Sequence, residues 1–491
     1  MILLLSIIGL AAFLFHQFYW RRRGFPPGPV PLPFVGNMLE VIWKQPGYDA
    51  YLDWEKKYGP IVTYYMGTKR IVAITSYEMM KKYIVQQGDK FSDREHFQGF
   101  NDMYRGGNYG IIESDGQLWR DQRRFAISTL RDFGMGKNLM QIRVLEEVDY
   151  MFARVEKAGM KLSAKELLNI AVGNIVNGII FGYRFDETTL PQFWNIRRIV
   201  QKQQQEMPSF IAIILWPPFR HFPYFRDSWK RLQGYRDDLF GYFNAQIETH
   251  RKEMDFDAEE SQCMAEVYLK EQRKHQNEPD QGGFSDIQLR NIVFDIWLAG
   301  LDTTVTTLQW GLNFCFNHPE LRVFEKMHEE LDRVVGRNRK VEMNDRNQLH
   351  YCNAVIAETQ RFLNLVPQNL MRIAGEDVNI EGYLIPKGTV VIPQISCVLF
   401  NEELFPEPRK FKPERFINED GTFKKVPELV PFSIGKRQCA GEGLARLELF
   451  LFFTNLVHKY ELSVDELPKM ERTFKTITEI PEFDLTFKER F

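Results

Sequence analysis

The 491-residue sequence is poor in cysteine and has no dominant sign of charge. Its five cysteines are odd in number and widely spaced, and no two form a C-x-x-C pair. This pattern argues against a disulfide scaffold and against a cysteine-rich zinc site, and it favours a reducing compartment. A formal net charge of −2 also removes any global electrostatic case for nucleic-acid binding.

Internal repeats, low-complexity tracts, and flavin or nicotinamide motifs are missing as well. The run Gly441-Glu442-Gly443 begins like a dinucleotide fingerprint, but no predicted strand precedes it and the third glycine is missing. What is present is 44% hydrophobic and 26% charged residues, a composition typical of a packed globular body. The 40 phenylalanines suit a large apolar interior or ligand cavity.

One long hydrophobic run stands at the N-terminus. Residues 1–20 read MILLLSIIGLAAFLFHQFYW and are followed directly by Arg21-Arg22-Arg23. Twenty helical residues rise about 30 Å, roughly the hydrocarbon thickness of a bilayer. A cleaved signal peptide, the main alternative, would carry positive charge before the run and a small-residue cleavage site after it. We therefore predict an uncleaved transmembrane signal-anchor at 1–20, with the arginines on the cytosolic side.

Prolines mark the segment that follows the anchor. FPPGPVPLPFVGN occupies Phe25 to Asn37, where proline fixes φ and removes backbone donors. We expect a stiff, extended, basic and proline-rich hinge over 21–37. The remainder, 38–491, reads as one main domain of many helices with a few strands. The predicted fold class is therefore mainly α with small β-sheets, preceded by one transmembrane helix.

Three segments of the main domain have distinct patterns. The clearest helix begins at Ser285, which forms a capping-box pattern with Gln288, and it stops before His318-Pro319 after about thirty mostly apolar residues. Gly382 to Pro393 contains β-prone runs around a Pro-Lys-Gly turn. Pro208 to Phe225 is apolar but broken by prolines, so it fits either a second membrane-dipping element or a buried helix with an irregular exit.

The stretch PFSIGKRQCAGEGLAR, residues 431–446, places a single cysteine between two glycines and ahead of a helix-like run. Gly435 and Gly441 let the backbone approach a flat ligand closely. Cys439 at a helix N-terminus would feel the positive end of the helix dipole and nearby N–H donors, which lower a thiol pKa. Arg437 is suited to pair a carboxylate of that ligand.

These positions carry a family resemblance. Phe432, Gly435, Arg437, Cys439 and Gly441 match the F-x-x-G-x-R-x-C-x-G signature of the cytochrome P450 family, which the chain resembles over nearly its whole length. It looks most similar to the animal microsomal branch, nematode members included. The resemblance implies the cytochrome P450 fold, with 38–491 as a haem-binding catalytic domain. It also implies haem b (iron protoporphyrin IX), with the cysteine thiolate as axial iron ligand.

Two further motifs resemble parts of the same family. Glu358 and Arg361 lie three apart on a predicted helix, hence on one face. With Arg415 they resemble the E-x-x-R network, whose implied role is to lock the loop that carries the cysteine. Trp119 and Arg123 match a W-x-x-x-R pattern that contacts a haem propionate. Arg372 stands where the family often supplies another propionate ligand, although either arginine could instead be a surface cation.

The long predicted helix carries Ala299-Gly300 followed by Asp302-Thr303-Thr304. One interpretation is structural: small residues pack closely and a threonine bonds back to a preceding carbonyl. The resemblance favours a functional one, the oxygen-activation segment. Ala299 and Gly300 would then leave room for O2 over the iron, while Thr303 and Asp302 relay protons as general acids.

The implied function is a haem-thiolate monooxygenase that inserts one oxygen atom from O2 into lipophilic substrates, by hydroxylation or epoxidation of fatty acids, steroids or xenobiotics. Electrons from NADPH would arrive through a separate reductase, with a b-type cytochrome as a further partner. Charge alone suggests docking near Arg120, Arg124 and Lys436. Family pocket regions match Ile296, Val366 to Leu370, and Thr476 to Thr478. The implied location is the endoplasmic reticulum membrane, single-pass, with the catalytic domain facing the cytosol.

Two other functions remain open. A haem-thiolate isomerase or dehydratase would act on peroxides without O2 or a reductase. A non-enzymatic haem protein would bind a gas or store haem. The retained Asp302-Thr303-Thr304 sequence argues against both.

Overall fold

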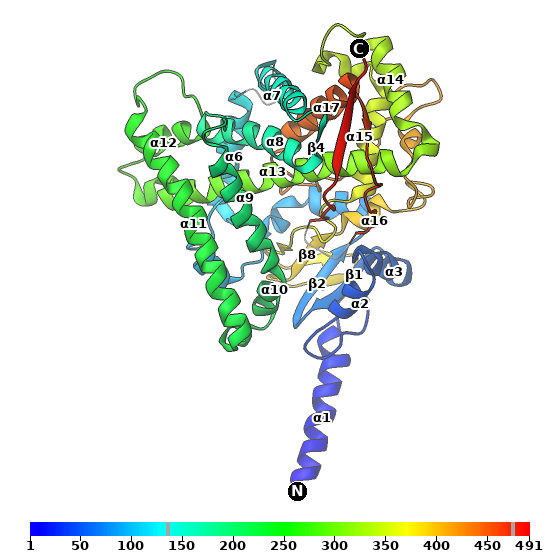
Figure 1. Cartoon of the computed structure of the whole chain (residues 1–491). Helices are drawn as coiled ribbons and strands as arrows, with labels where there is room; N and C mark the ends of the chain where they lie inside the picture. The colour runs from blue at the N-terminus through cyan, green and yellow to red at the C-terminus, as the bar shows by residue number, and fades with distance from the viewer. Residues whose placement is uncertain (134–137, 473–476) are drawn as a thin grey trace.

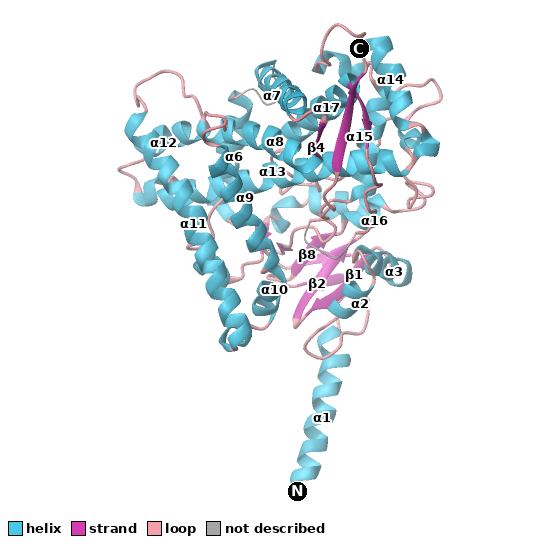
Figure 2. Ribbon diagram, in the orientation of Figure 1, coloured by secondary structure: helices cyan, strands magenta, loops and turns pink. Residues whose placement is uncertain are grey.

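The computed structural model describes residues 1–133, 138–472 and 477–491. Helices make up most of the body and three small sheets lie among them (Figures 1 and 2). This confirms the predicted fold class. The helices are α1 Ile2–Phe18, α2 Met38–Trp43, α3 Tyr48–Tyr58, α4 Tyr77–Met79, α5 Gln98–Arg105, α6 Gly116–Asp132, α7 Asn138–Lys157, α8 Ala164–Phe181, α9 Leu190–Gln205, α10 Met207–Leu215, α11 Pro223–Glu253, α12 Met264–Lys274, α13 Asp286–Asn317, α14 Val323–Val334, α15 His350–Leu363, α16 Ile395–Leu399 and α17 Glu442–Lys459.

The strands form a five-stranded sheet in the order β1-β2-β8-β5-β3, a three-stranded sheet β4-β10-β9, and the pair β6-β7. Their bounds are β1 Ile61–Met66, β2 Lys69–Ile74, β3 Asp93–Arg94, β4 Lys161–Ser163, β5 Arg372–Ile373, β6 Val378–Ile380, β7 Tyr383–Ile385, β8 Val390–Pro393, β9 Tyr460–Ser463 and β10 Asp484–Glu489.

The β-prone stretch at Gly382 to Pro393 does form two strands, but they belong to different sheets. β7 pairs antiparallel with β6, whereas β8 runs parallel to β2 and antiparallel to β5. Every residue of β8 is buried, which suits a central strand, while β7 is mostly accessible.

The long central helix α13 runs for 32 residues and is buried along most of its length, as predicted. Its N-terminal cap is only half of the expected capping box. The Ser285 hydroxyl accepts from the Gln288 N–H at 3.3 Å. The Gln288 side chain, however, accepts from the Gly110 N–H at 2.9 Å and donates to the Gly110 carbonyl at 3.2 Å. Tertiary packing has therefore drawn Gln288 into tying α13 to the loop before α6.

The N-terminal helix α1 extends away from the body (Figure 1). Two segments among the described residues are long and apolar enough to cross a membrane, Leu4–Arg22 and Ala164–Phe181. The second is 83% buried inside the protein because it is α8, which packs against α13 and α7. The first is only 6% buried, so α1 suits a membrane anchor.

The proline-rich segment after α1 has no helix from residue 26 to 31, and it is fixed to the body by backbone contacts that the sequence did not predict. The Thr63 N–H of β1 donates to the Pro27 carbonyl at 3.0 Å, and a Cβ added at Gly28 would lie 1.8 Å from the Thr63 oxygen. Leu32 and Gly36 exchange two backbone hydrogen bonds, so the chain turns back there. Contact with β1 therefore replaces the free extension that proline alone would favour.

Pro208 to Phe225 combines features of both expected structures. α10 is half-buried, with Ser209 and Ile213 inside. After it the chain passes through a short 3₁₀ turn into α11, and there Phe222 and Tyr224 are exposed. Figure 1 shows α10 and the start of α11 at the same end of the molecule as α1.

Candidate active site

Cys439 lies two residues before the N-cap of α17, in the predicted place. Its N–H donates to the Phe432 carbonyl at 3.0 Å, which closes the loop. Gly435 has φ +80°, and a Cβ there would meet the Ile84 oxygen at 2.3 Å, so this turn requires glycine. Cys439 is solvent-accessible, whereas the other four cysteines are buried.

We expected the protein to lower the pKa of Cys439, but the protein alone does not. Although the side chain is accessible, protein atoms surround it closely enough that burial raises the pKa of the thiol. The Gly441 N–H and the charge of Arg123 oppose that effect only in part. A metal cation coordinated by the sulfur would deprotonate such a thiol.

Four arginines gather around this loop, and they share a shortage of counter-charge. Burial lowers the pKa of Arg437 to about 9, and Arg94 and Arg123 lower it further while Asp115 opposes them. Burial likewise holds the pKa of Arg372 well below its usual range, with Arg94, Arg437 and Arg123 adding to the effect. Arginines that repel one another in a buried place are typical of a binding site for an anion.

Arg437 makes its contacts within the protein. It donates to the Ser92 carbonyl at 2.5 Å and to the Ser114 carbonyl at 2.6 Å, and it stacks 3.9 Å above the Trp119 ring. It also forms an ion pair with the Asp115 carboxylate at 3.1 Å. Arg123 donates to the Gln438 carbonyl, next to the cysteine.

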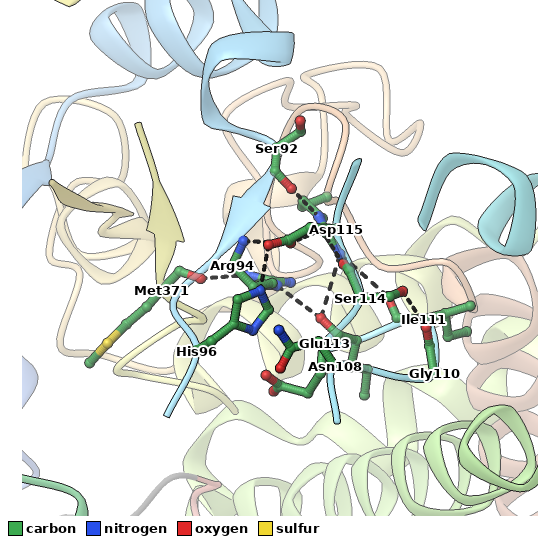
Figure 3. Close-up of polar contacts among 12 residues, drawn as sticks. Ser92, Arg94, His96, Asn108, Gly110, Ile111, Glu113, Ser114, Asp115 and Met371 are labelled. Carbon is green, nitrogen blue, oxygen red and sulfur yellow. Dashed lines mark hydrogen bonds and ion pairs between the residues drawn. The ribbon is translucent and has the colours of Figure 1, made fainter. Parts of the chain in front are cut away.

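Figure 3 shows residues that sequence reasoning missed. The Asp115 carboxylate accepts from the Arg94 backbone N–H at 2.8 Å and contacts the His96 Nε2 at 2.5 Å. The Arg94 side chain donates to the Ile112 and Met371 carbonyls at 3.1 and 2.9 Å. Asp115 is the N-cap of α6, a position that helix-start signals could have found, whereas Arg94 has no spacing signature.

The residues present fit a flat ligand with two carboxylates. Trp119 Nε1 and Arg372 Nε are buried and lack a hydrogen-bond partner among the described residues. Buried donors of this kind cost free energy unless a ligand accepts from them. Arg372 Nη2 donates to the Ile434 carbonyl at 2.7 Å and to the Ser433 hydroxyl at 3.3 Å, which holds the guanidinium beside the cysteine loop. A haem, with an iron for Cys439 and two propionates for the arginines, matches this donor set.

The predicted oxygen-activation segment lies on α13 as expected, and its polar side chains have protein partners. The Thr303 hydroxyl donates to the Ala299 carbonyl at 2.6 Å. Asp302 forms an ion pair with Arg197 of α9 at 2.6 Å, although the atoms are not aligned as a hydrogen bond. The Thr304 hydroxyl donates at 3.3 Å to Glu448 on α17, which joins this segment to the helix after the cysteine.

The three residues of the predicted ion network meet in the core. Arg361 binds Glu358 through two nitrogens at 2.7 and 2.8 Å, and both side chains are fully buried. Arg415 reaches the same carboxylate at 3.0 Å. The arginines also donate to carbonyls between Leu399 and Lys410. The network therefore fixes the segment upstream of the cysteine loop, not that loop itself.

The predicted pocket residues are only partly joined. Thr478 is buried, and its N–H donates to the Leu365 carbonyl at 2.9 Å, next to the 366–370 segment. Ile296 is partly buried on α13, while Leu370 is exposed. Thr476 lies outside the described residues. On the predicted docking face, Arg120 and Arg124 are exposed and Lys436 pairs with Asp89.

Comparison with known proteins decides the family. The family model described as Cytochrome P450 matches residues 26–487. The chain belongs to the cytochrome P450 family. Similar proteins include "Cytochrome P450 2H2" of Gallus gallus, 36% identical over 94% of this chain and 92% of that protein. "Cytochrome P450 2A5" of Mus musculus is 33% identical over 95% of this chain and 94% of its own length. "Cytochrome P450 2D20" of Mesocricetus auratus is 35% identical over 91% and 88%.

This P450 is therefore a monooxygenase, as expected from the sequence, because its likeness to these enzymes extends over nearly the whole chain. Family membership implies a haem held through a cysteine thiolate and electron delivery by a redox-partner reductase. The accessible N-terminal helix agrees with anchoring in a membrane.

Proposed function

We propose that this P450 hydroxylates or epoxidises lipophilic substrates such as fatty acids, steroids or xenobiotics. The supporting observation is the arginine cluster beside Cys439, in which two buried donors lack a partner among the described residues. In this proposal Cys439 ligates the iron of haem b, and the donors of Trp119, Arg123, Arg372 and Arg437, together with those of the missed Arg94, hold its propionates. When bound, the haem activates O2 so that one oxygen atom enters the substrate and the other leaves as water.

Proton delivery is assigned to α13. The Thr303 hydroxyl, now donating to the Ala299 carbonyl, rotates to donate toward the reacting oxygen. Asp302 holds the proton supply, and its ion pair with Arg197 keeps α9 against α13. Thr303→Val should lower the yield of oxygenated product per NADPH consumed, whereas Thr303→Ser, which keeps the hydroxyl, should retain most of it. Equal yields in both variants would contradict this role.

In this proposal the chain is anchored in the endoplasmic reticulum membrane, and its catalytic domain lies in the cytosol. Residues 1–20 form the anchor, 21–37 the connection and 38–491 the catalytic domain. Phe222 and Tyr224 are exposed at the start of α11. Figure 1 shows this start of α11 at the same end of the molecule as α1, which supports a second contact with the lipid surface. An NADPH-dependent reductase, with a b-type cytochrome as a further donor, docks on the face of Arg120, Arg124 and Lys436.

The test is NADPH-dependent turnover with added reductase of pooled fatty acids, steroids and xenobiotics, followed by mass spectrometry. A product heavier by one oxygen that is absent with Cys439→Ala supports the proposal and narrows the substrate class. Turnover of peroxides without NADPH would instead support the isomerase or dehydratase. A ligand-binding spectrum without any product would favour a non-enzymatic haem protein.

A further inference from the structure

A cluster of three metal-ligand residues lies apart from the haem site, where α11 ends and α12 begins. His250 is in the last turn of α11, Cys263 is the N-cap of α12, and Glu266 is in its first turn. Their ligand atoms (imidazole nitrogen, thiol sulfur and carboxylate oxygen) all lie within 4.8 Å of one another. The site shares no residue with the haem-binding set described above.

The donor set and its spacing fit one class of cation. Cys263 Sγ lies 3.9 Å from His250 Nδ1, which lies 3.5 Å from Glu266 Oε1. Ligands bound to tetrahedral zinc at about 2.0–2.3 Å lie roughly 3.3–3.6 Å from one another. The His250–Glu266 separation lies in this range and the Cys263–His250 separation exceeds it by about 0.3 Å, while all three ligand atoms lie within 4.8 Å of one another, so small side-chain shifts would bring them onto one ion. Sulfur, nitrogen and oxygen in one site favour zinc over the hard cations calcium and magnesium.

Neighbouring groups orient each of the three ligands. The Phe181 ring stacks on the His250 ring at 5.9 Å with an 11° interplanar angle. The second Glu266 oxygen accepts from the Gln262 N–H at 2.7 Å, which turns the first oxygen toward His250. Backbone N–H groups of residues 265 and 266 point to the Cys263 sulfur and favour its thiolate form. Such supporting contacts are typical of a metal site.

Burial differs among the ligands in a useful way. Cys263 is fully buried, while the side chains of His250 and Glu266 are 18% and 15% accessible. A cation can therefore enter from the solvent side and keep a water molecule there as its fourth ligand. Burial raises the pKa of the Cys263 thiol to about 12, so binding of the metal must displace the thiol proton.

We propose that His250, Cys263 and Glu266 form a zinc site that clamps the end of α11 to the start of α12. Zinc bound there closes the chain between residues 250 and 263 and fixes the far end of α11, the helix whose other end carries the exposed aromatic side chains. The role is structural, and it is independent of the monooxygenase reaction.

The test uses the full-length, untagged, haem-loaded protein dialysed against buffered Zn²⁺. Metal analysis should give one zinc per chain, and zinc-edge X-ray absorption should show a sulfur neighbour at about 2.3 Å. His250→Gln, Cys263→Ser and Glu266→Gln should each weaken zinc binding at least about tenfold and abolish the zinc-dependent rise in melting temperature. An unchanged thiolate-haem spectrum in each variant shows that it is folded and that Cys439 is not the sulfur observed.

The matched control is His275→Gln. His275 also contacts two carboxylates, Glu271 at 3.3 Å and Glu278 at 2.9 Å, but without a thiol. This variant should bind zinc like the unchanged protein. Zinc with no sulfur neighbour, zinc binding that survives Cys263→Ser, or no saturable binding at all would each overturn the proposal and leave a hydrogen-bonded cluster only.

Discussion

The protein has two groups of buried arginines, which differ in whether their charges and their hydrogen-bond donors have partners. In the network of Glu358, Arg361 and Arg415, all three guanidinium nitrogens of Arg361 donate to a carboxylate or a carbonyl. In the group around Cys439, Arg94, Arg123, Arg372 and Arg437 repel one another. There, Arg372 Nε and the indole N–H of Trp119 also lack a partner among the described residues.

The difference separates a structural role from a binding role. A network in which every charge and donor has a partner gains nothing from a ligand. Removing one member of such a network leaves the charge of its partner buried and unpaired. An unsatisfied group destabilises the protein by itself and is retained where a ligand completes it. The burial of an arginine therefore does not by itself indicate a binding function. Whether its charge and its donors have partners within the protein does.

The largest effect should come from breaking the satisfied network. Arg361→Ala leaves the Glu358 carboxylate buried with only Arg415, which should cost about 3–5 kcal/mol of unfolding free energy. Urea unfolding of the haem-loaded protein measures this. The control is Arg409→Ala, which removes a surface pair with Asp49 at 2.8 Å and should cost less than about 1 kcal/mol. Equal losses of unfolding free energy in the two variants would contradict the difference between the buried network and the surface pair.

A second comparison uses two buried glutamates. Glu358 has two arginine partners, whereas the Thr304 hydroxyl is the one side-chain partner of Glu448 in the part of the chain that the structure describes. Burial raises the Glu448 pKa to about 8 from 4.5. Folding therefore keeps Glu448 protonated, and its contribution to stability is lost as the pH rises from 4.5 through 8. By pH 7 the loss should reach about 3 kcal/mol, because each pH unit between the two pKa values costs about 1.4 kcal/mol.

Glu448→Gln should abolish most of that pH dependence, as followed by unfolding at a series of pH values. A smaller dependence of the same sign should remain from Glu55, whose pKa burial raises to about 7. A variant as pH-dependent as the unchanged protein would show that Glu448 is already ionised in the folded state.

An intermediate effect is expected in the unsatisfied group. Arg372→Leu removes one charged partner of a propionate, which should cost about 1.5–3 kcal/mol of haem affinity, or roughly tenfold or more in dissociation constant. It also relieves repulsion, so the free energy of unfolding without haem should not fall. Haem transfer to a scavenging protein and urea unfolding measure the two quantities separately. A parallel loss of both would assign Arg372 to structure.

The smallest effect on stability should come from the surface. Lys436 and Asp89 form an exposed ion pair, so Lys436→Ala should change the unfolding free energy by less than about 1 kcal/mol. Turnover with reductase should nevertheless fall, and more at low salt than at high salt, because steering by charge is screened. Lys57→Ala, at an exposed lysine of α3, serves as control. No loss of turnover in Lys436→Ala relative to the unchanged protein, or a loss that is the same at low and at high salt, would contradict docking at this face.

Local signals explain what the sequence could predict. The anchor, the α13 helix and the cysteine loop each lie in one contiguous run of residues, so local sequence patterns predicted them. Arg94, Asp115 and the Arg197 partner of Asp302 were missed because their roles depend on segments that meet only in the fold. Asp115, for example, joins β3 to Arg437, 322 residues farther along the chain. The contact of the 21–37 segment with β1 was not predicted for the same reason, because it too forms only in the fold.

The attachment of the anchor to the body affects how substrate concentration should be counted. Arg21 donates to the Thr68 carbonyl at 2.8 Å, and Tyr65 and Arg70 donate to the Arg21 carbonyl at 3.0 and 2.6 Å. With α1 in the bilayer, as proposed, these contacts would hold the body beside the membrane, where it would take up compounds dissolved in lipid. When a substrate partitions into lipid, lowering the amount of lipid at constant total substrate raises the substrate concentration in the lipid. The apparent Michaelis constant should therefore scale with the lipid volume of the assay.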